Sequence, residues 1–234
     1  MQRSQEALAL ARVLAHPYSL ALAQFWVVYL HCRRREAPAV QEQADALLTL
    51  ATAQGFALWV EVGTCWRGWA LAMQGQSEAG LAQLHHGLAT VLTTGWTLGL
   101  PSCLVLLGEA AGHAGQVAEG LRFLTEGLTA FEASGRGDGL VEAYRLQGEL
   151  LLRQTVPDAA QAGVCFQQAL AIARRQQARP WELRAALSLS RLWQQQGKRT
   201  EAHALLAPVY DWFTEGFDTA DLQEARALLD ALGA

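Results

Sequence analysis

Glycine residues recur at intervals of forty along much of this 234-residue chain. Three sets of glycines share this spacing: Gly55, Gly95 and Gly135; Gly68, Gly108 and Gly148; and Gly75 and Gly115. A fixed period of this length is typical of a solenoid, in which each repeat buries its apolar face only against its neighbours. The period therefore predicts a repeat architecture rather than one compact core.

The repeat that begins at Gly55 is expected to contain two helices. From Leu58 to Gln74, apolar residues fall at intervals of three and four, which is the period of one helix face. Gly75 is expected to end this helix, because glycine accepts the left-handed backbone conformation common just past a helix end. Ser77 then begins a second helix, which ends at Gly95.

Further glycines lie inside these expected helices. They are Gly68, Gly80 and Gly87, with counterparts forty residues later at Gly108, Gly120 and Gly127. A glycine inside a helix costs about 1 kcal/mol relative to alanine. Its return at matching positions predicts that the two helices of a repeat cross at close range there.

The same pattern accounts for the whole chain as one repeat domain, residues 1–234. We expect a preceding or capping helix over residues 1–17, five helix-pair repeats over 18–217 and a C-terminal capping helix over 218–234. The third repeat is expected to span Trp96 to Gly135 and the fourth Asp138 to Ala178. The fifth opens at Pro180 and ends at Gly216, with Phe213 in its second helix. The predicted fold is an all-α, right-handed superhelical solenoid of antiparallel helix pairs.

Composition and charge limit the classes of partner that the protein can bind and its expected location in the cell. The formal charge of −4 argues against general nucleic-acid binding, which needs a concentrated basic face. Charged residues in the first helix argue against a secretory signal. The uncharged stretch Val13 to Cys32 has about the length of a membrane span, but Pro17 and the alignment of Trp26 with Trp66 favour a repeat helix. We therefore expect a cytoplasmic protein with no membrane or nucleic-acid partner.

The residues that usually carry catalysis or bind metals do not form known motifs. The six histidines make no H-E-x-x-H pair, and no serine lies in a G-x-S-x-G turn. The four cysteines include no C-x-x-C pair and are expected to be reduced core thiols. Gly135, Gly137 and Gly139 follow a helix and lack a Gly-Lys-Ser/Thr end, so they predict a link between repeats rather than a phosphate loop. We expect no enzyme activity, no cofactor and no metal.

Two resemblances to known families bear on the fold. Leu107-Gly108, with the small residues Gly120 and Gly127, resembles tetratricopeptide repeats (TPRs), although the period here is about forty rather than thirty-four. The C-terminal part of the chain resembles the end of large bacterial signalling ATPases, in the segments Pro180–Ala186, Leu192–Lys198, Leu206–Tyr210 and Phe213–Leu222. His16–Ala21 is similar to the same repeat region further upstream.

Those ATPases often join a nucleotidyl cyclase-like domain, a P-loop ATPase domain and a long helical-repeat region. The resemblance therefore implies a sensor or scaffold arm whose partners are proteins, peptides or other domains of a parent protein. It transfers no catalytic residue to this chain.

In TPR-like repeats the first helices line the concave surface, where ligands usually bind. The residues after one set of repeat glycines are expected to face this surface: Trp69, Glu109 and Glu149. Tyr29 is an equivalent position, and Arg145 and Arg153 lie about one turn either side of Glu149. Such a surface, aromatic first and charged later, would suit a partner with an apolar anchor and a basic or zwitterionic tail. The aromatic residues could instead only pack between helices. Glu109 and Glu149 could act as paired carboxylates in acid chemistry, but salt bridges with Arg145 and Arg153 are the better interpretation.

These features predict a non-catalytic protein- or peptide-binding scaffold that regulates a larger bacterial signalling ATPase. One alternative is a small-molecule sensor, whose pocket Tyr29, Trp66 and Trp69 would line. Another is self-association through exposed terminal helices, which would make the protein a homo-oligomer.

Overall fold

The computed structural model describes residues 2–94, 99–135, 137 and 139–233, and every regular element within them is an α-helix. The twelve helices of these residues are α1 (Gln2–Val13), α2 (Pro17–Arg33), α3 (Ala37–Gln54), α4 (Ala57–Met73), α5 (Ser77–Thr94), α6 (Leu100–His113), α7 (Val117–Ser134), α8 (Leu140–Leu152), α9 (Ala159–Arg175), α10 (Arg179–Gln195), α11 (Arg199–Tyr210) and α12 (Ala220–Gly233). The all-α class predicted from the sequence is therefore confirmed.

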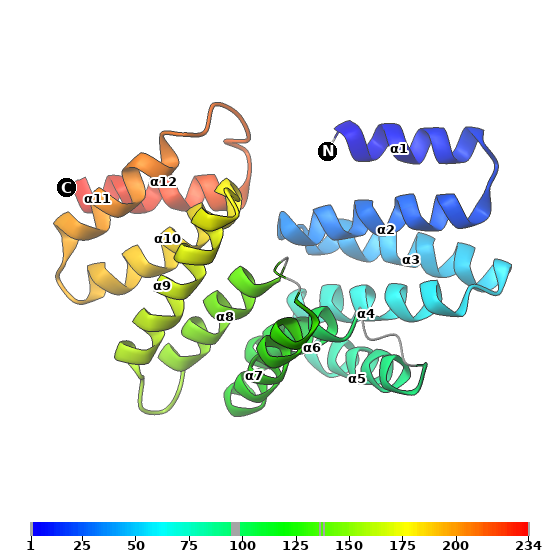
Figure 1. The fold of residues 1–234 in the computed structure, drawn as a ribbon, viewed down its shortest axis with the longest axis horizontal. Helices are drawn as coiled ribbons and strands as arrows, with labels where there is room; N and C mark the ends of the chain where they lie inside the picture. The colour runs from blue at the N-terminus through cyan, green and yellow to red at the C-terminus, as the bar shows by residue number, and fades with distance from the viewer. Residues whose placement is uncertain (1, 95–98, 136, 138, 234) are drawn as a thin grey trace. The chain divides into compact units, whose positions relative to one another are not determined.

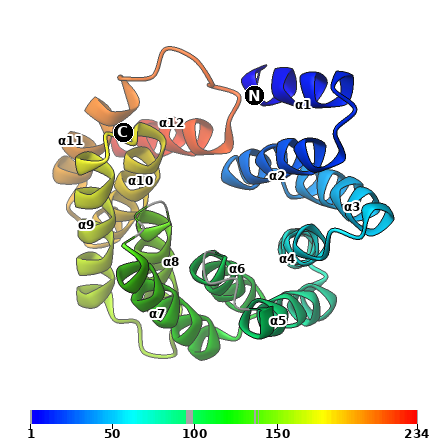
Figure 2. The same ribbon diagram turned by 45° about the vertical axis from the view of Figure 1, so that its right-hand side comes forward.

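The chain divides into two compact units, Met1–Gln116 and Val117–Ala234, here called the N-terminal and C-terminal units. Within each unit consecutive helices pack against each other, as Figures 1 and 2 show for α1 to α4. Alternate helices also meet: α4 contacts α2 and α6, and α10 contacts α8 and α12. Apart from α12, which corresponds to the expected capping helix, these alternate helices are the first helices of successive repeats, and together they form one layer of each unit. That the two units act as one domain stays a prediction.

The turns between helices follow the forty-residue period in their backbone conformation. Gly75 has a φ of +86°, and the next residue donates its N–H to the carbonyl of Leu71 at 2.9 Å, which closes the end of α4. Arg35 occupies the position forty residues earlier and also has a positive φ, +64°. Ala15 has the same relation to Gly55, with φ values of +49° and +69°. The repeat geometry is thus kept even where glycine is absent.

Two glycines allow α4 and α5 to cross at close range, as the sequence predicts. A Cβ added at Gly80 would lie 2.5 Å from the carbonyl oxygen of Gly68 and 2.6 Å from the amide nitrogen of Ala72. In the C-terminal unit the equivalent Gly148 instead faces a side chain, since its Cβ would lie 2.5 Å from Cε1 of the fully buried Phe166. Backbone meets backbone in one repeat, and a ring fills the space in another.

The expected boundaries need correction near the C-terminus. The second helix of the fifth repeat ends at Tyr210, so Phe213 lies beyond it rather than within it. Pro208 lies inside the last turn and has no N–H to continue the helical ladder. The hydroxyl of Thr219, just before α12, donates to the carbonyl of Gly216 at 2.7 Å. The expected repeat positions at Gly95, Trp96 and Asp138 lie outside the described residues.

No helix among residues 2–94, 99–135, 137 and 139–233 combines the length and apolar character that a membrane span requires.

Candidate binding surfaces

The N-terminal unit carries an exposed apolar stripe on α2. Tyr18, Leu22 and Trp26 follow one another at intervals of four, so they lie on one face of the helix. Their side chains are 46%, 41% and 50% exposed, which is unusual for large apolar residues so close together. We call these three residues the α2 stripe.

Aromatic rings beside the stripe connect α2 to α4. Tyr18 meets Trp59 edge-on, with ring centroids 5.7 Å apart, and Phe25 lies at the same distance from Trp59. Tyr29 meets Trp66 edge-on at 6.2 Å and Trp26 at 5.6 Å. Edge-to-face contacts of this kind are favourable beyond the apolar area they bury. These ring contacts pack the α2 stripe against the aromatic side chains of α4.

A basic segment lies at the C-terminal end of α2. The guanidinium of Arg33 lies 4.6 Å from the centroid of the Tyr29 ring, a cation–π contact. Glu36 accepts from His31 Nδ1 at 2.6 Å and from Arg34 Nε at 2.7 Å. Burial alone would raise the pKa of Glu36, but the hydrogen bonds and charges of His31 and Arg34 lower it below its usual value.

Trp69 and Glu109, two residues predicted to share a surface, are in direct contact. The indole Nε1 of Trp69 donates to Oε2 of Glu109 at 2.7 Å and joins α4 to α6. Trp69 is only 2% exposed, whereas Glu109 is half-buried. A partner on this face would therefore meet the Glu109 carboxylate rather than the indole. Tyr29, the third predicted residue of this unit, contacts Trp66, and no described contact joins it to Trp69.

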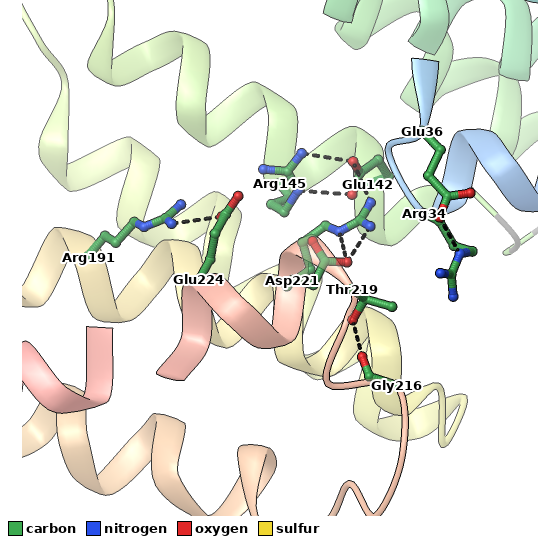
Figure 3. Close-up of polar contacts among 10 residues, drawn as sticks. Arg34, Glu36, Glu142, Arg145, Arg191, Gly216, Thr219, Asp221 and Glu224 are labelled. Atoms are coloured by element: carbon green, nitrogen blue, oxygen red, sulfur yellow. Dashed lines mark hydrogen bonds and ion pairs between the residues drawn. The ribbon is translucent and has the colours of Figure 1, made fainter. Parts of the chain in front are cut away.

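The C-terminal unit carries a charged network instead of an aromatic one. Arg145 on α8 donates to both carboxylate oxygens of Glu142, at 2.8 and 2.9 Å, and to Glu149 Oε1 at 3.4 Å. Figure 3 shows the paired contacts between Arg145 and Glu142. Ser188 on α10 donates its hydroxyl proton to the same Glu149 oxygen at 2.7 Å. Glu149 is thus held from two helices.

Arg184 connects three helices through this network. Its Nη2 lies 2.5 Å from Asp221 Oδ2 on α12, and its Nη1 lies 3.3 Å from Glu142 Oε1 on α8. The residue is 7% exposed. Burial alone would lower the pKa of Arg184, but the carboxylates of Glu142 and Asp221 raise it above its usual value. The guanidinium therefore stays charged inside the layer formed by α8, α10 and α12.

The six residues predicted from the sequence are divided between the two units. Trp69 meets Glu109 in one unit, and Arg145 meets Glu149 in the other. Arg153 lies exposed at the C-terminal end of α8. Chemically, each carboxylate of the network is already neutralised by an arginine or accepts a hydroxyl proton, so the arrangement suits recognition and packing better than proton transfer.

Sequence reasoning missed four members of the charged network: Glu142, Arg184, Ser188 and Asp221. A signal for them was present, because the contacting residues of neighbouring repeats are 37 to 42 positions apart. Charged residues that lie about forty positions apart in the sequence of such a solenoid are therefore candidates for contact between the first helices of neighbouring repeats.

Within the described part of the chain, no three His, Cys, Asp or Glu side chains gather closely enough to hold a metal ion.

Comparison with known proteins gives structural matches alone. No protein-family model matches the chain, and no curated protein matches it in sequence. Among solved structures, it is similar to BtubC (BKLC) from P. vanneervenii, with a TM-score of 0.63, 14% identity, and coverage of 98% of this chain and 90% of that one. The apo form of RapI matches with a TM-score of 0.62 and 14% identity, over 90% of this chain and 80% of RapI.

A third match is a Podosopora anserina protein with nearly identical TPR-like repeats. One of its crystal structures has a TM-score of 0.58 and 17% identity, over 83% of this chain and 94% of that one. At such identities the likeness concerns the fold, and it agrees with the TPR-like class that the sequence predicts.

Proposed function

We propose that this chain is a non-catalytic repeat module that binds a protein or peptide. The observation that carries the proposal is the α2 stripe. An exposed apolar patch on a TPR-like scaffold costs solubility unless a partner covers it, and aromatic residues are the side chains that most often anchor such partners.

The stripe favours a partner with apolar anchors. Trp26 and Tyr18 are each backed by other rings, so they are already ordered before a partner arrives. Little side-chain entropy is then lost on binding. The sequence-predicted Glu109 would add polar recognition in the same unit, and Glu149 would do so on the first-helix layer of the C-terminal unit.

The wider role is inferred from the sequence resemblance. Residues 180–222 resemble the C-terminal end of large bacterial signalling ATPases, so the module is proposed to be a regulatory arm of such a protein. In that role its partner is either a separate polypeptide or another domain of the parent.

The test is selection of binders from a random peptide library, followed by calorimetric titration of the enriched peptides. The wild-type chain is compared with a Tyr18→Ser/Trp26→Ser double variant and with Trp212→Ser as a matched control. Trp212 is 55% exposed and belongs to the C-terminal unit. We expect the double variant to weaken binding by at least about tenfold and the control to leave it unchanged.

Two results would contradict the proposal. One is that no peptide is enriched on the wild-type chain over a library control. The other is that the double variant and the wild type bind the enriched peptides equally. Glu109→Gln and Glu149→Gln, titrated with the same peptides, test whether the sequence-predicted carboxylates contribute.

A further inference from the structure

Two buried cysteines of the N-terminal unit are in contact. Cys65 on α4 and Cys103 on α6 are 38 positions apart, and their sulfur atoms lie 3.7 Å from each other. Both are free thiols, 7% and 4% exposed. A disulfide bond is about 2.05 Å long, so the sulfurs need to approach by only about 1.6 Å.

The surroundings of the pair hold the two sulfurs together. Gly87 of α5 lies directly against the sulfur of Cys65, since a Cβ at Gly87 would overlap it. One turn after Cys65, Trp69 donates to Glu109 at 2.7 Å, so α4 and α6 are already joined beside the pair. In the C-terminal unit, by contrast, Cys165 donates its thiol proton to Gln147.

We propose that Cys65 and Cys103 form a reversible intrachain disulfide when the protein meets hydrogen peroxide. One thiolate attacks a peroxide oxygen and becomes a sulfenic acid, releasing water once the leaving oxygen is protonated. The second sulfur attacks the first, forms the S–S bond and expels a second water. The two thiols lose two protons and two electrons in total, and peroxide is reduced to two waters. A dithiol reductant reverses the bond by exchange.

Burial slows the oxidation of this thiol pair and favours the internal disulfide over other oxidation products. Hydrogen bonding to Cys65, together with burial, raises the pKa of Cys103 well above its usual value, so little thiolate is present at neutral pH. The tight packing also leaves little room for a bulky adduct such as glutathione. The expected end product is therefore the internal disulfide, and its equilibrium is more informative than its rate.

The disulfide would affect the surface that contains Glu109, which the proposed function uses. Formation of the disulfide does not itself depend on that function. A disulfide between α4 and α6 would fix the same two helices that the contact between Trp69 and Glu109 connects. Oxidation would then lock this part of the first-helix layer.

The experiment measures the disulfide equilibrium in a Cys32→Ser/Cys165→Ser variant, which keeps only the proposed pair. The chain is equilibrated with mixtures of reduced and oxidised glutathione, once folded and once in concentrated urea. Trapped thiols are alkylated and counted by intact mass, and the bond is located by peptide mapping. Because the fold holds the sulfurs in contact, we expect the equilibrium constant for the internal disulfide to be at least about tenfold higher in the folded chain.

Controls make the outcome decisive. Cys103→Ser added to the same variant leaves one thiol, so it is expected to form no internal disulfide and to give a mixed disulfide with glutathione only in urea. Peroxide treatment of the wild-type chain, mapped in the same way, should yield the peptide that joins Cys65 to Cys103, and it replaces the double variant if that variant does not fold. An equilibrium constant no higher in the folded chain than in urea, or mixed disulfides as the final product, would overturn the proposal.

Discussion

Replacement of Gly80 by alanine tests whether α4 and α5 need their close crossing. The added Cβ would lie 2.5 Å from the Gly68 carbonyl oxygen, 2.6 Å from the Ala72 amide nitrogen and 2.8 Å from the Ala72 Cβ. Two of these atoms belong to the backbone, which cannot rotate away as a side chain can. To restore ordinary contacts near 3.4 Å, the helices must separate locally by about 0.9 Å, which loosens the packing around them.

The expected magnitude is the balance of two terms. Alanine gains about 1 kcal/mol over glycine in helix propensity. Forcing an extra methyl group into a well-packed contact costs about 1–3 kcal/mol, and the rigid backbone neighbours place this site at the upper end. We therefore expect Gly80→Ala to lower the free energy of unfolding by about 1–2 kcal/mol.

Gly163→Ala is the matched control. Gly163 also lies inside a helix, α9, but its added Cβ would meet only Leu192 Cδ2, at an ordinary 3.6 Å. There the propensity gain is unopposed, so the variant should be more stable by about 0.5–1 kcal/mol.

Urea unfolding followed by far-UV circular dichroism gives the free energies of both variants. Hydrogen exchange then assigns each change to its own helix pair, which matters because a repeat protein can open locally. The reasoning is refuted if Gly80→Ala is as stable as wild type, or if Gly163→Ala loses as much stability as Gly80→Ala.

Three further predictions concern single residues. Arg184→Met leaves the buried Glu142 and the half-buried Asp221 without the cation that they share, and it should lower the unfolding free energy by about 3 kcal/mol; an unchanged thermal midpoint would contradict this. Glu36 has a lowered pKa, so the folded state binds its proton less strongly than the unfolded state. Its stabilisation is present above the usual pKa of 4.5 and is lost as the pH falls through the folded value; Glu36→Gln should remove this part of the pH dependence of unfolding. Gln177 has a φ of +52°, so Gln177→Gly should relieve strain and raise stability by up to about 1 kcal/mol; a loss measured in urea would count against a strained turn.

The sequence by itself determined the class of fold and the positions of most helices. Apolar residues at intervals of three and four define the helix faces, and glycines define the turns, because both depend mainly on local backbone geometry. The boundaries at Gly75 and Ser77 are found as expected. The turns at Ala15 and Arg35 also follow the period, although their residues do not reveal a positive φ.

The candidate surfaces were only partly predictable. The forty-residue period places Trp69 beside Glu109, because equivalent positions of adjacent repeats lie side by side; that the two residues form a binding surface stays a prediction. It could not distinguish Trp26 from Trp66, which share a repeat position but are 50% and 5% exposed. Exposure depends on which neighbouring helices cover a face, and that is not written in the repeat itself.

Only the tertiary structure decided which long-range partners meet. Arg184 finds Glu142 and Asp221, and Cys65 finds Cys103, through contacts between helices that are distant in sequence. Such contacts depend on the angle and distance at which helices cross, and a difference of one turn along either helix would separate them. The local pattern therefore specifies the repeat, while the packing of repeats specifies the charged network and the thiol pair.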